Sequence, residues 1–341
     1  MSFPLARRLV ALAACAAFVA GASAQTGDIK ERNIKLSYVT AKDSPYGLGV
    51  NKLAEIVAAR SGGKMKLRGY SDGQLGAEVQ SISAAQGGVL EMALVSTAAV
   101  AGNVKEFALF DFPFLFTDER EAYAVLDGAV GTQLLGKLQD RGLVGLCYWE
   151  VGFRHVTNSR RPVNRLEDFK GLKIRTIQNP VFVDVFNTLG ANATPMAFTE
   201  VYTALESKAL DGQETPYNII YTSRFHEVQK FLSATRHIYG PGVVLVGRKF
   251  WDQLSADERK ILQDGCAEAR EFERKASRDL DARVLTEMRA KGLVVNEISP
   301  EERVRMREQV KPVIEKHTAT VGPDLVKQAY AEIERVRRQP R

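Results

Sequence analysis

An arginine in a predicted strand is the residue of this sequence best suited to ligand chemistry. Arg175 lies in the segment LKIRT, which we predict to be a strand over Leu172–Thr176. Its planar guanidinium matches the two oxygens of a carboxylate, and an arginine after an apolar strand end points into a cleft. On the strand pattern alone, an ordinary surface ion pair is the favoured alternative. The chemistry that Arg175 offers is anion binding.

Catalytic motifs are absent from the sequence. It has no glycine-rich dinucleotide fingerprint and no G-x-S-x-G. Residues 131–138 imitate a phosphate-binding loop, but Leu138 stands where a hydroxyl should coordinate Mg²⁺, and the stretch is predicted to be mid-helix. No histidine has metal-ligand spacing, so we expect structural roles for all of them and neither a metal nor a cofactor. The histidines are His155, His226, His237 and His317.

Length and composition limit the class of protein. The chain has 341 residues, 45% hydrophobic and 26% charged, which are ordinary globular proportions. Two domains are expected, because single cores usually stop growing at about 250 to 300 residues. Lys and Arg number 47 against 41 Asp and Glu, and the excess is spread along the chain. Nucleic acid would leave a concentrated basic stripe, so no nucleic acid partner is expected, whereas a small anionic ligand is compatible.

The first 24 residues are predicted to form a signal peptide. Arg7 and Arg8 precede the 12 apolar residues Leu9–Ala20, and a small-residue cleavage pattern places the mature start near Gln25. Twelve residues are too few to span a hydrocarbon core of about 30 Å as a helix. Two alternatives are an N-terminal membrane anchor and lipid modification at Cys15. The segment predicts export.

Two cysteines remain after the signal peptide. Cys147 and Cys266 are 119 positions apart and could pair in an oxidising compartment. The sequence cannot show that their Cα atoms approach within about 7 Å. Two buried thiols are the favoured interpretation.

Short extended segments alternate with helices along the chain. A second unit begins near Gly152, and Thr199 is predicted to cap a helix. The alternation indicates an open α/β sheet covered by helices. Extended segments are predicted at Ile34–Thr40, Lys64–Tyr70, Leu90–Ser96, Leu143–Trp149, Leu172–Thr176, Ala193–Met196, Leu210–Thr215 and Ile238–Gly247 (interrupted by the Gly-Pro-Gly at 240–242), and helices at Gly49–Arg60, Glu78–Gln86, Glu119–Gln139, Asn179–Leu189 and Thr199–Ala209.

One helix is predicted to be much longer than the others. Ser255 and Glu258 form a capping box, and the helical pattern continues to Lys291. At 1.5 Å per residue its length is about 50 Å, so we expect it to lie across both lobes of a two-lobed protein. A coiled coil is the alternative. Its apolar stripe is predicted to be Leu262, Ala269, Phe272, Ala276, Leu280, Val284 and Met288.

Several ordered motifs resemble a known receptor family. The series resembles the solute-binding receptors of tripartite ATP-independent periplasmic (TRAP) transporters, the DctP family, over essentially the whole mature chain. The motifs are GFRHVTN at 152–158, DFKGLKIR at 168–175, PMAFTEVYTAL at 195–205 and DGQE at 211–214, with SDGQLG at 71–76, FPFLF at 112–116 and HEVQK at 226–230.

The resemblance implies a fold and a function. The fold is a two-lobed α/β periplasmic binding protein, class II-like, with the long helix spanning both lobes. Lobe I is expected at 25–151 plus 241–280, and lobe II at 152–240 plus 281–341 with the C-terminal helices. The implied protein is a periplasmic monomer, not an enzyme. It would bind a small organic acid, such as a dicarboxylate, and deliver it to TRAP membrane permease subunits for uptake driven by an ion gradient.

The resemblance also implies site residues. Arg175 matches the family arginine that binds the ligand carboxylate with two hydrogen bonds. Arg154 matches a second arginine that often contacts the same anion, although a role in packing between the lobes is the alternative. Phe198 matches an aromatic pocket residue, with core packing as the alternative.

Other positions match more loosely. Thr215 stands where the better-studied sugar-acid receptors carry asparagine, so the loss of an amide donor argues against a sialic-acid-like ligand. Glu78 and Ser96 match polar contacts from the first lobe. Trp149 and Tyr217, together with Tyr221, could supply aromatic walls.

Two other classes of function remain open on the sequence, and one other type of binding receptor is disfavoured. A secreted enzyme acting on a carboxylate is disfavoured, because no nucleophile and base are paired. A ligand-binding input module for a membrane sensor cannot be separated from a transport receptor by sequence. An ABC-type receptor is disfavoured by the long helix and by the Lys-Ile-Arg strand.

Overall fold

The computed structural model describes residues 29–339. The predicted signal peptide and Cys15 lie outside the described residues. Within the described range, no helix combines the length and apolar character needed to cross a membrane.

The strands form a mixed sheet in the order β2-β1-β3-β9-β4-β7-β5-β6, while β8 pairs with β4 and with β10. We call the part built on β1–β3 lobe I and the part built on β5–β7 lobe II. Within each lobe these strands run parallel. The strands are β1 (Arg32–Ser37), β2 (Met65–Tyr70), β3 (Met92–Ser96), β4 (Leu143–Asn158), β5 (Lys173–Thr176), β6 (Asn192–Pro195), β7 (Gly212–Pro216), β8 (Phe231–Ala234), β9 (Tyr239–Gly247) and β10 (Val294–Glu297).

Strand β4 belongs to both lobes. It pairs with β9 from Leu143 to Phe153 and with β7 from Arg154 to Asn158, antiparallel in both cases. The prediction of a strand ending at Trp149 was therefore wrong, and so was the predicted interruption of β9 at its Gly-Pro-Gly. The Gly-Pro-Gly segment of β9 stays paired with β4 because the register shifts between Glu150 and Gly152.

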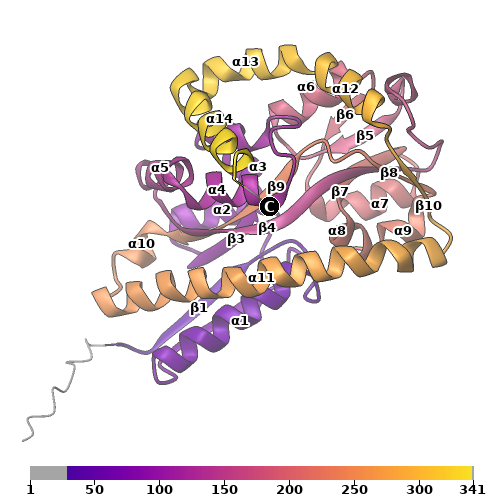
Figure 1. The fold of residues 1–341 in the computed structure, drawn as a ribbon. Helices are drawn as coiled ribbons and strands as arrows, with labels where there is room; N and C mark the ends of the chain where they lie inside the picture. The colour runs from indigo at the N-terminus through magenta and orange to yellow at the C-terminus, as the bar shows by residue number, and fades with distance from the viewer. Residues whose placement is uncertain (1–28, 340–341) are drawn as a thin grey trace, which may run out of the picture.

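Helices cover both faces of the sheet. In Figure 1, α1 and α11 lie along one side, and the C-terminal α13 and α14 lie on the opposite side. The helices are α1 (Pro45–Arg60), α2 (Glu78–Gly87), α3 (Thr97–Val100), α4 (Glu119–Asp127), α5 (Ala129–Lys137), α6 (Pro180–Thr188), α7 (Val201–Glu206), α8 (Tyr217–Thr222), α9 (Phe225–Val228), α10 (Arg248–Trp251), α11 (Ala256–Ala290), α12 (Pro300–Gln309), α13 (Lys311–Val321) and α14 (Pro323–Arg337), with 3₁₀ turns η1 (Lys105–Asp111), η2 (Leu138–Arg141), η3 (Leu166–Phe169) and η4 (Phe198–Glu200).

The long helix α11 spans both lobes, as predicted (Figure 1). Its capping box is formed by Ser255 and Glu258. Its N-terminal half packs in the apolar core of lobe I beside α1, and Val284 and Met288 near its other end pack in the core of lobe II. Phe272, predicted to be in the buried stripe, is instead 44% exposed.

The two remaining cysteines form a disulfide, which corrects the prediction of two buried thiols. Cys147 in β4 and Cys266 in α11 are bonded, with Cα atoms 6.1 Å apart. The bond ties the N-terminal half of α11 to the sheet of lobe I. Sequence separation hid the pairing, because only the packing of α11 across β4 brings the two positions together.

Two predicted helices differ from the structure. The helix predicted over 119–139 breaks at Gly128, where a Cβ atom would lie 2.4 Å from the carbonyl oxygen of Ala124. Thr199 lies inside η4 and caps nothing; α7 begins after Glu200 without a side-chain cap. The residue boundaries given above for the two lobes stay a prediction.

Candidate functional site

A buried cavity lies between the two lobes, at the carboxyl ends of parallel strands β1, β3, β5 and β7. Ligands of open α/β sheets bind at such strand ends. We call it the inner cavity, and its space, including the part that is open to solvent, is about 400 Å³. It is lined by Val39, Thr40, Tyr46, Glu78, Ser96, Val151, Arg154, Arg175, Ile177, Phe198, Thr215 and Ile219.

The structure brings six of the eight predicted site residues together in this lining. Glu78 and Ser96 come from lobe I, and the other four come from lobe II or the shared strand β4. The six are Glu78, Ser96, Arg154, Arg175, Phe198 and Thr215.

Arg175 is a buried cation whose charge is not paired. Its side chain is 2% exposed, and Nε and Nη2 donate to the backbone oxygen of Met196 at 3.0 and 2.7 Å. Among residues 29–339, no carboxylate lies within 4.0 Å of its guanidinium. Burial lowers the pKa of Arg175 to about 10, although Glu214 and Glu78 act against that effect. A bound anion would complete the site.

Arg154, in contrast, already has an internal partner. Its Nε and Nη2 donate to the two carboxylate oxygens of Glu214 at 2.5 and 2.8 Å, and Nη2 also reaches the Glu214 backbone oxygen. His237 contacts the same carboxylate at 3.2 Å. Burial alone would raise the pKa of Glu214, but Arg154 and His237 lower it. Arg154 therefore lines the cavity with most of its donors engaged.

Lobe I contributes a carboxylate and a helix cap. Glu78 Oε1 accepts a hydrogen bond from the Ser96 backbone nitrogen at 2.6 Å. Burial raises the pKa of Glu78, against the lowering effects of Ser96, Arg175 and Arg154. The Ser96 hydroxyl accepts from the Ala98 backbone nitrogen and caps α3. These groups give the cavity an acceptor-rich wall opposite Arg175.

Sequence reasoning missed Tyr46, which also lines the cavity. Its side chain is buried, and its hydroxyl has no hydrogen-bond partner among residues 29–339. Burial raises its pKa well above the usual value, and Glu273 and Glu78 add to the effect. Buried polar groups nearly always have a partner. Its place in the first turn of a helix that follows a parallel strand was the available signal.

Phe198 and Thr215 line the cavity from lobe II. The Phe198 ring centroid lies 5.8 Å from the Arg175 guanidinium carbon, and the ring also packs on Phe225. Thr215 is 2% exposed and lies opposite His155 in the β4–β7 ladder.

Trp149 and Tyr217 lie elsewhere. Trp149 is fully buried in the core of lobe I against Tyr46. Tyr217 stacks on His155 with ring centroids 3.8 Å apart, and Tyr221 stacks on His226. None of the three aromatic residues is in the lining of the inner cavity.

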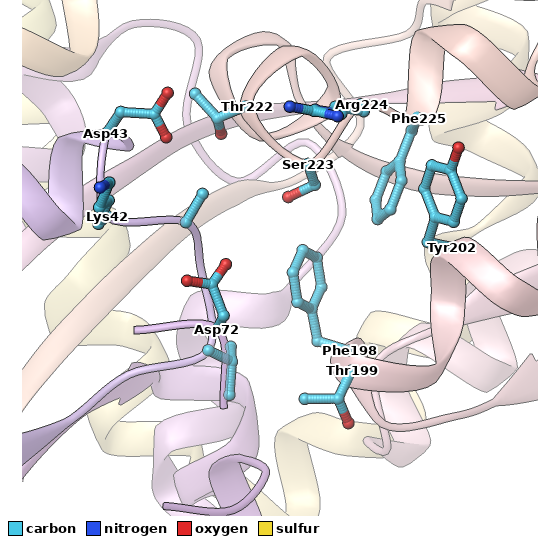
Figure 2. A pocket seen from close by; sticks show the side chains of 12 residues that line it. Lys42, Asp43, Asp72, Phe198, Thr199, Tyr202, Thr222, Ser223, Arg224 and Phe225 are labelled. Carbon is cyan, nitrogen blue, oxygen red and sulfur yellow. The ribbon is translucent and has the colours of Figure 1, made fainter. Parts of the chain in front are cut away.

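A second, larger cavity opens beside the first. Figure 2 shows this outer cavity, which has an empty volume of about 1390 Å³. Val39 and Phe198 line both cavities, so the outer cavity is the mouth of the inner one. Its charged lining residues are Lys42, Asp43, Asp72 and Arg224.

Behind the inner cavity, α11 crosses β4 through a group of acids that we call the acidic seam, which consists of the buried Glu150 and Glu273 and the half-buried Asp281. Glu273 accepts from the Glu150 backbone nitrogen at 2.9 Å, and Asp281 accepts from the Asn218 backbone nitrogen at 2.8 Å. Burial raises the pKa of all three acids, that of Asp281 to about 7. The seam therefore favours protonated carboxyl groups beside the strand that joins the lobes.

Comparison with known proteins places this geometry in a family. The sequence model of the bacterial extracellular solute-binding proteins, family 7, matches residues 36–320. The chain is 37% identical over 281 residues to the 2,3-diketo-L-gulonate-binding periplasmic protein YiaO of Escherichia coli, covering 82% of this chain and 86% of that protein. It is 33% identical to the C4-dicarboxylate-binding periplasmic protein DctP of Rhodobacter capsulatus, covering 88% and 91%.

Solved structures agree. The crystal structure of the sugar acid binding protein DctPAm from Advenella mimigardefordensis in complex with galactonate is 44% identical, with a TM-score of 0.89, and covers 90% of this chain and 99% of that chain. The two-lobed α/β fold with a long crossing helix is thus confirmed. The chain belongs to the bacterial extracellular solute-binding proteins, family 7, the DctP family of TRAP periplasmic solute-binding proteins.

Proposed function

We propose that this protein is an exported, periplasmic receptor that binds one small organic acid in the inner cavity and delivers it to TRAP membrane permease subunits. The signal peptide, the periplasmic location, the monomeric state and the absence of catalysis are parts of this proposal. The supporting observation is Arg175, a buried guanidinium with no carboxylate partner among the described residues.

The proposed ligand class is a hydroxylated monocarboxylic acid. The charges of Arg154 and Glu214 neutralise each other, so the charge of Arg175 can be neutralised by one ligand carboxylate. A second carboxylate would lie in a small cavity that already contains Glu78, and an uncompensated buried charge is costly. Glu78, Ser96, Thr215 and the unpartnered Tyr46 hydroxyl can instead hydrogen-bond to ligand hydroxyls. The galactonate ligand of the similar DctPAm belongs to this class.

The test is a binding comparison among three acids after unfolding, dialysis and refolding have removed any carried-over ligand. Galactonate has one carboxylate and hydroxyls, hexanoate has one carboxylate alone, and succinate has two carboxylates. We expect galactonate to bind at least about tenfold more tightly than the others. At 100 times Kd it should add about 2.7 kcal/mol to the free energy of unfolding, which is several degrees in the melting midpoint.

The variants Arg175→Ala and Arg161→Ala sharpen the test. Arg161 is a matched control, because it also donates through Nε and Nη2 to backbone oxygens in lobe II, those of Asp168 and Lys170. Only Arg175→Ala should abolish the shift. Tighter succinate binding would contradict the monocarboxylate assignment, and binding of none of the three acids would contradict a receptor for such acids.

Delivery to a permease is tested separately. Uptake of labelled galactonate into cells should require both this protein and permease genes encoded with it. Binding without such uptake would favour a sensor input module, and chemical conversion of the bound acid would favour an enzyme.

A further inference from the structure

Four charged side chains line the mouth of the cleft. Lys42 and Asp43 follow β1, Asp72 follows β2, and Arg224 lies between α8 and α9 (Figure 2). None has an ion-pair partner within 4.0 Å in the described part of the chain. Asp43 and Asp72 thus line the cavity from lobe I, because they follow β1 and β2, and Arg224 lines the same cavity from lobe II.

Two of these residues have an unfavourable backbone conformation. Asp72 has a φ of +56° and Arg224 a φ of +57°, in the left-handed region. Aspartate visits that region occasionally because its short side chain can hydrogen-bond locally, whereas for arginine the conformation costs about 1 to 2 kcal/mol. Glycine would relieve the cost at Arg224. A strained residue in a cleft points to function more than to stability.

The two rims already approach each other. A Cβ atom on Gly73 would lie 2.5 Å from Cγ2 of Thr199, so the loop that carries Asp72 touches lobe II. Glu287 and burial raise the pKa of Tyr221, and Asp43 adds to that effect from the opposite rim. Tyr221 is three residues before Arg224. Closure of the cleft would move the rim that carries Arg224 toward the rim that carries the two acids.

We propose that Arg224 forms a charge latch with Asp43 and Asp72 when the cleft closes over its ligand. The fork of the guanidinium can bind both carboxylates at once. The latch forms only in the closed state, so it lowers the ligand dissociation rate and has little effect on association. Arg224 is then a positioning residue that acts through lobe closure, and the inference rests on the proposed function.

The latch is tested by the kinetics of galactonate dissociation in stopped flow at low and high salt. Arg224→Gln should raise koff by about threefold to tenfold in 50 mM salt, with kon within about twofold of wild type. In 500 mM salt the difference should largely disappear, because exposed ion pairs are screened. Arg224→Gly should raise koff equally while leaving the melting midpoint unchanged or higher.

Two controls separate the latch from other effects. Lys208 is an exposed cation of lobe II with a φ of +60°, so Lys208→Gln removes a comparable charge and should not change koff. Asp43→Asn/Asp72→Asn should raise koff as Arg224→Gln does, and the triple variant should add nothing further, because all remove one interaction.

Each contrary result has a defined meaning. Additive effects, no salt dependence, or an equal effect of Lys208→Gln would overturn the latch. A loss of galactonate affinity in Arg224→Gln without any loss for the shorter acid erythronate would show direct ligand contact and would also overturn it. Failure of the wild-type protein to bind galactonate would overturn the proposed function together with the latch, whereas wild-type binding with unchanged variant kinetics would overturn the latch alone.

Discussion

The inner cavity and the acidic seam both bury charge between the lobes, but they balance it differently. In the cavity, Arg154 is paired with Glu214, while Arg175 donates to the backbone oxygen of Met196 and has no carboxylate partner among residues 29–339. In the seam, burial raises the pKa values of Glu150 and Glu273, and the Arg278 guanidinium lies 3.7 Å from the Glu150 carboxylate. A buried arginine cannot lose its proton near neutral pH, whereas a buried acid can take one up. The buried charge of Arg175 can therefore be balanced only by another charged group, whereas the buried acids can lose their charge by protonation.

The largest loss of stability is expected from breaking the ion pair between Arg154 and Glu214. Glu214→Ala leaves Arg154 buried without a carboxylate, so it should lower the free energy of unfolding by about 3 to 5 kcal/mol. Chemical denaturation without ligand measures this loss. Glu200→Ala, at an exposed position of the same lobe, is the control. A loss no larger than in the control would mean that the buried pair is not stabilising.

The second largest loss of stability is expected from removing the disulfide that joins β4 to α11 in lobe I. The double variant Cys147→Ser/Cys266→Ser should lose about 2 to 4 kcal/mol, because the bond closes a long loop in the unfolded chain. Reduction of the wild-type protein should give the same loss. The denatured mature protein should show no free thiol before reduction, and two free thiols would contradict the bond.

The variant Arg175→Ala should show most clearly that Arg175 contributes to ligand affinity and not to the stability of the ligand-free protein. Galactonate affinity should fall at least about tenfold, or about 1.4 kcal/mol. In the ligand-free protein, however, the free energy of unfolding should stay the same or rise, because an uncompensated buried charge has been removed. Calorimetric titration and denaturation measure the two quantities. Unchanged affinity would remove Arg175 from the site.

The smallest effect is expected in the seam. The pKa of Asp281 is about 7 in the folded protein, raised chiefly by burial, against about 3.9 in an unfolded chain. The folded state therefore holds an extra proton between these values, and its stability falls as pH rises from about 4 to about 7. Asp281→Asn should remove this fall.

The gain from Asp281→Asn at pH 8 should be about 1 to 2 kcal/mol, less than the full shift because the side chain is partly exposed. Melting at pH 5 and pH 8 measures it. Asp279→Asn, on the exposed face of the same helix, should show no such dependence on pH. An equal gain at both pH values would mean that Asp281 does not hold the proton.

The sequence predicted local elements better than long-range pairing. The long helix was predictable because its capping box is local, at Ser255 and Glu258. The continuity of β4 through Gly152 was not, because glycine normally marks a break and only pairing with β9 compensates for it. The disulfide was missed for the same reason, since its two ends meet only in the folded protein.

The site was predicted from motifs, and its electrostatics were not. The resemblance implied that Arg154 assists Arg175 in binding the anion, but the pairing of β4 with β7 places Glu214 within hydrogen-bond distance of Arg154 and not of Arg175. Trp149 was expected in the cavity wall and is fully buried in the core of lobe I. The pairing and direction of the strands determine which side chains meet, and these long-range contacts could not be predicted from a single sequence.

The disulfide also constrains the order in which the chain can be completed. Its bond encloses the stretch between Cys147 and Cys266, two residues 119 positions apart, which contains β5, β6 and β7 of lobe II together with β9. During synthesis Cys147 must wait with a free thiol until that stretch has followed it. Once the bond has formed, a single proteolytic cut in an exposed loop of lobe II leaves both fragments covalently attached. The bond can therefore form only after the N-terminal half of α11 has been synthesised, and it then holds β5, β6 and β7 within one closed loop.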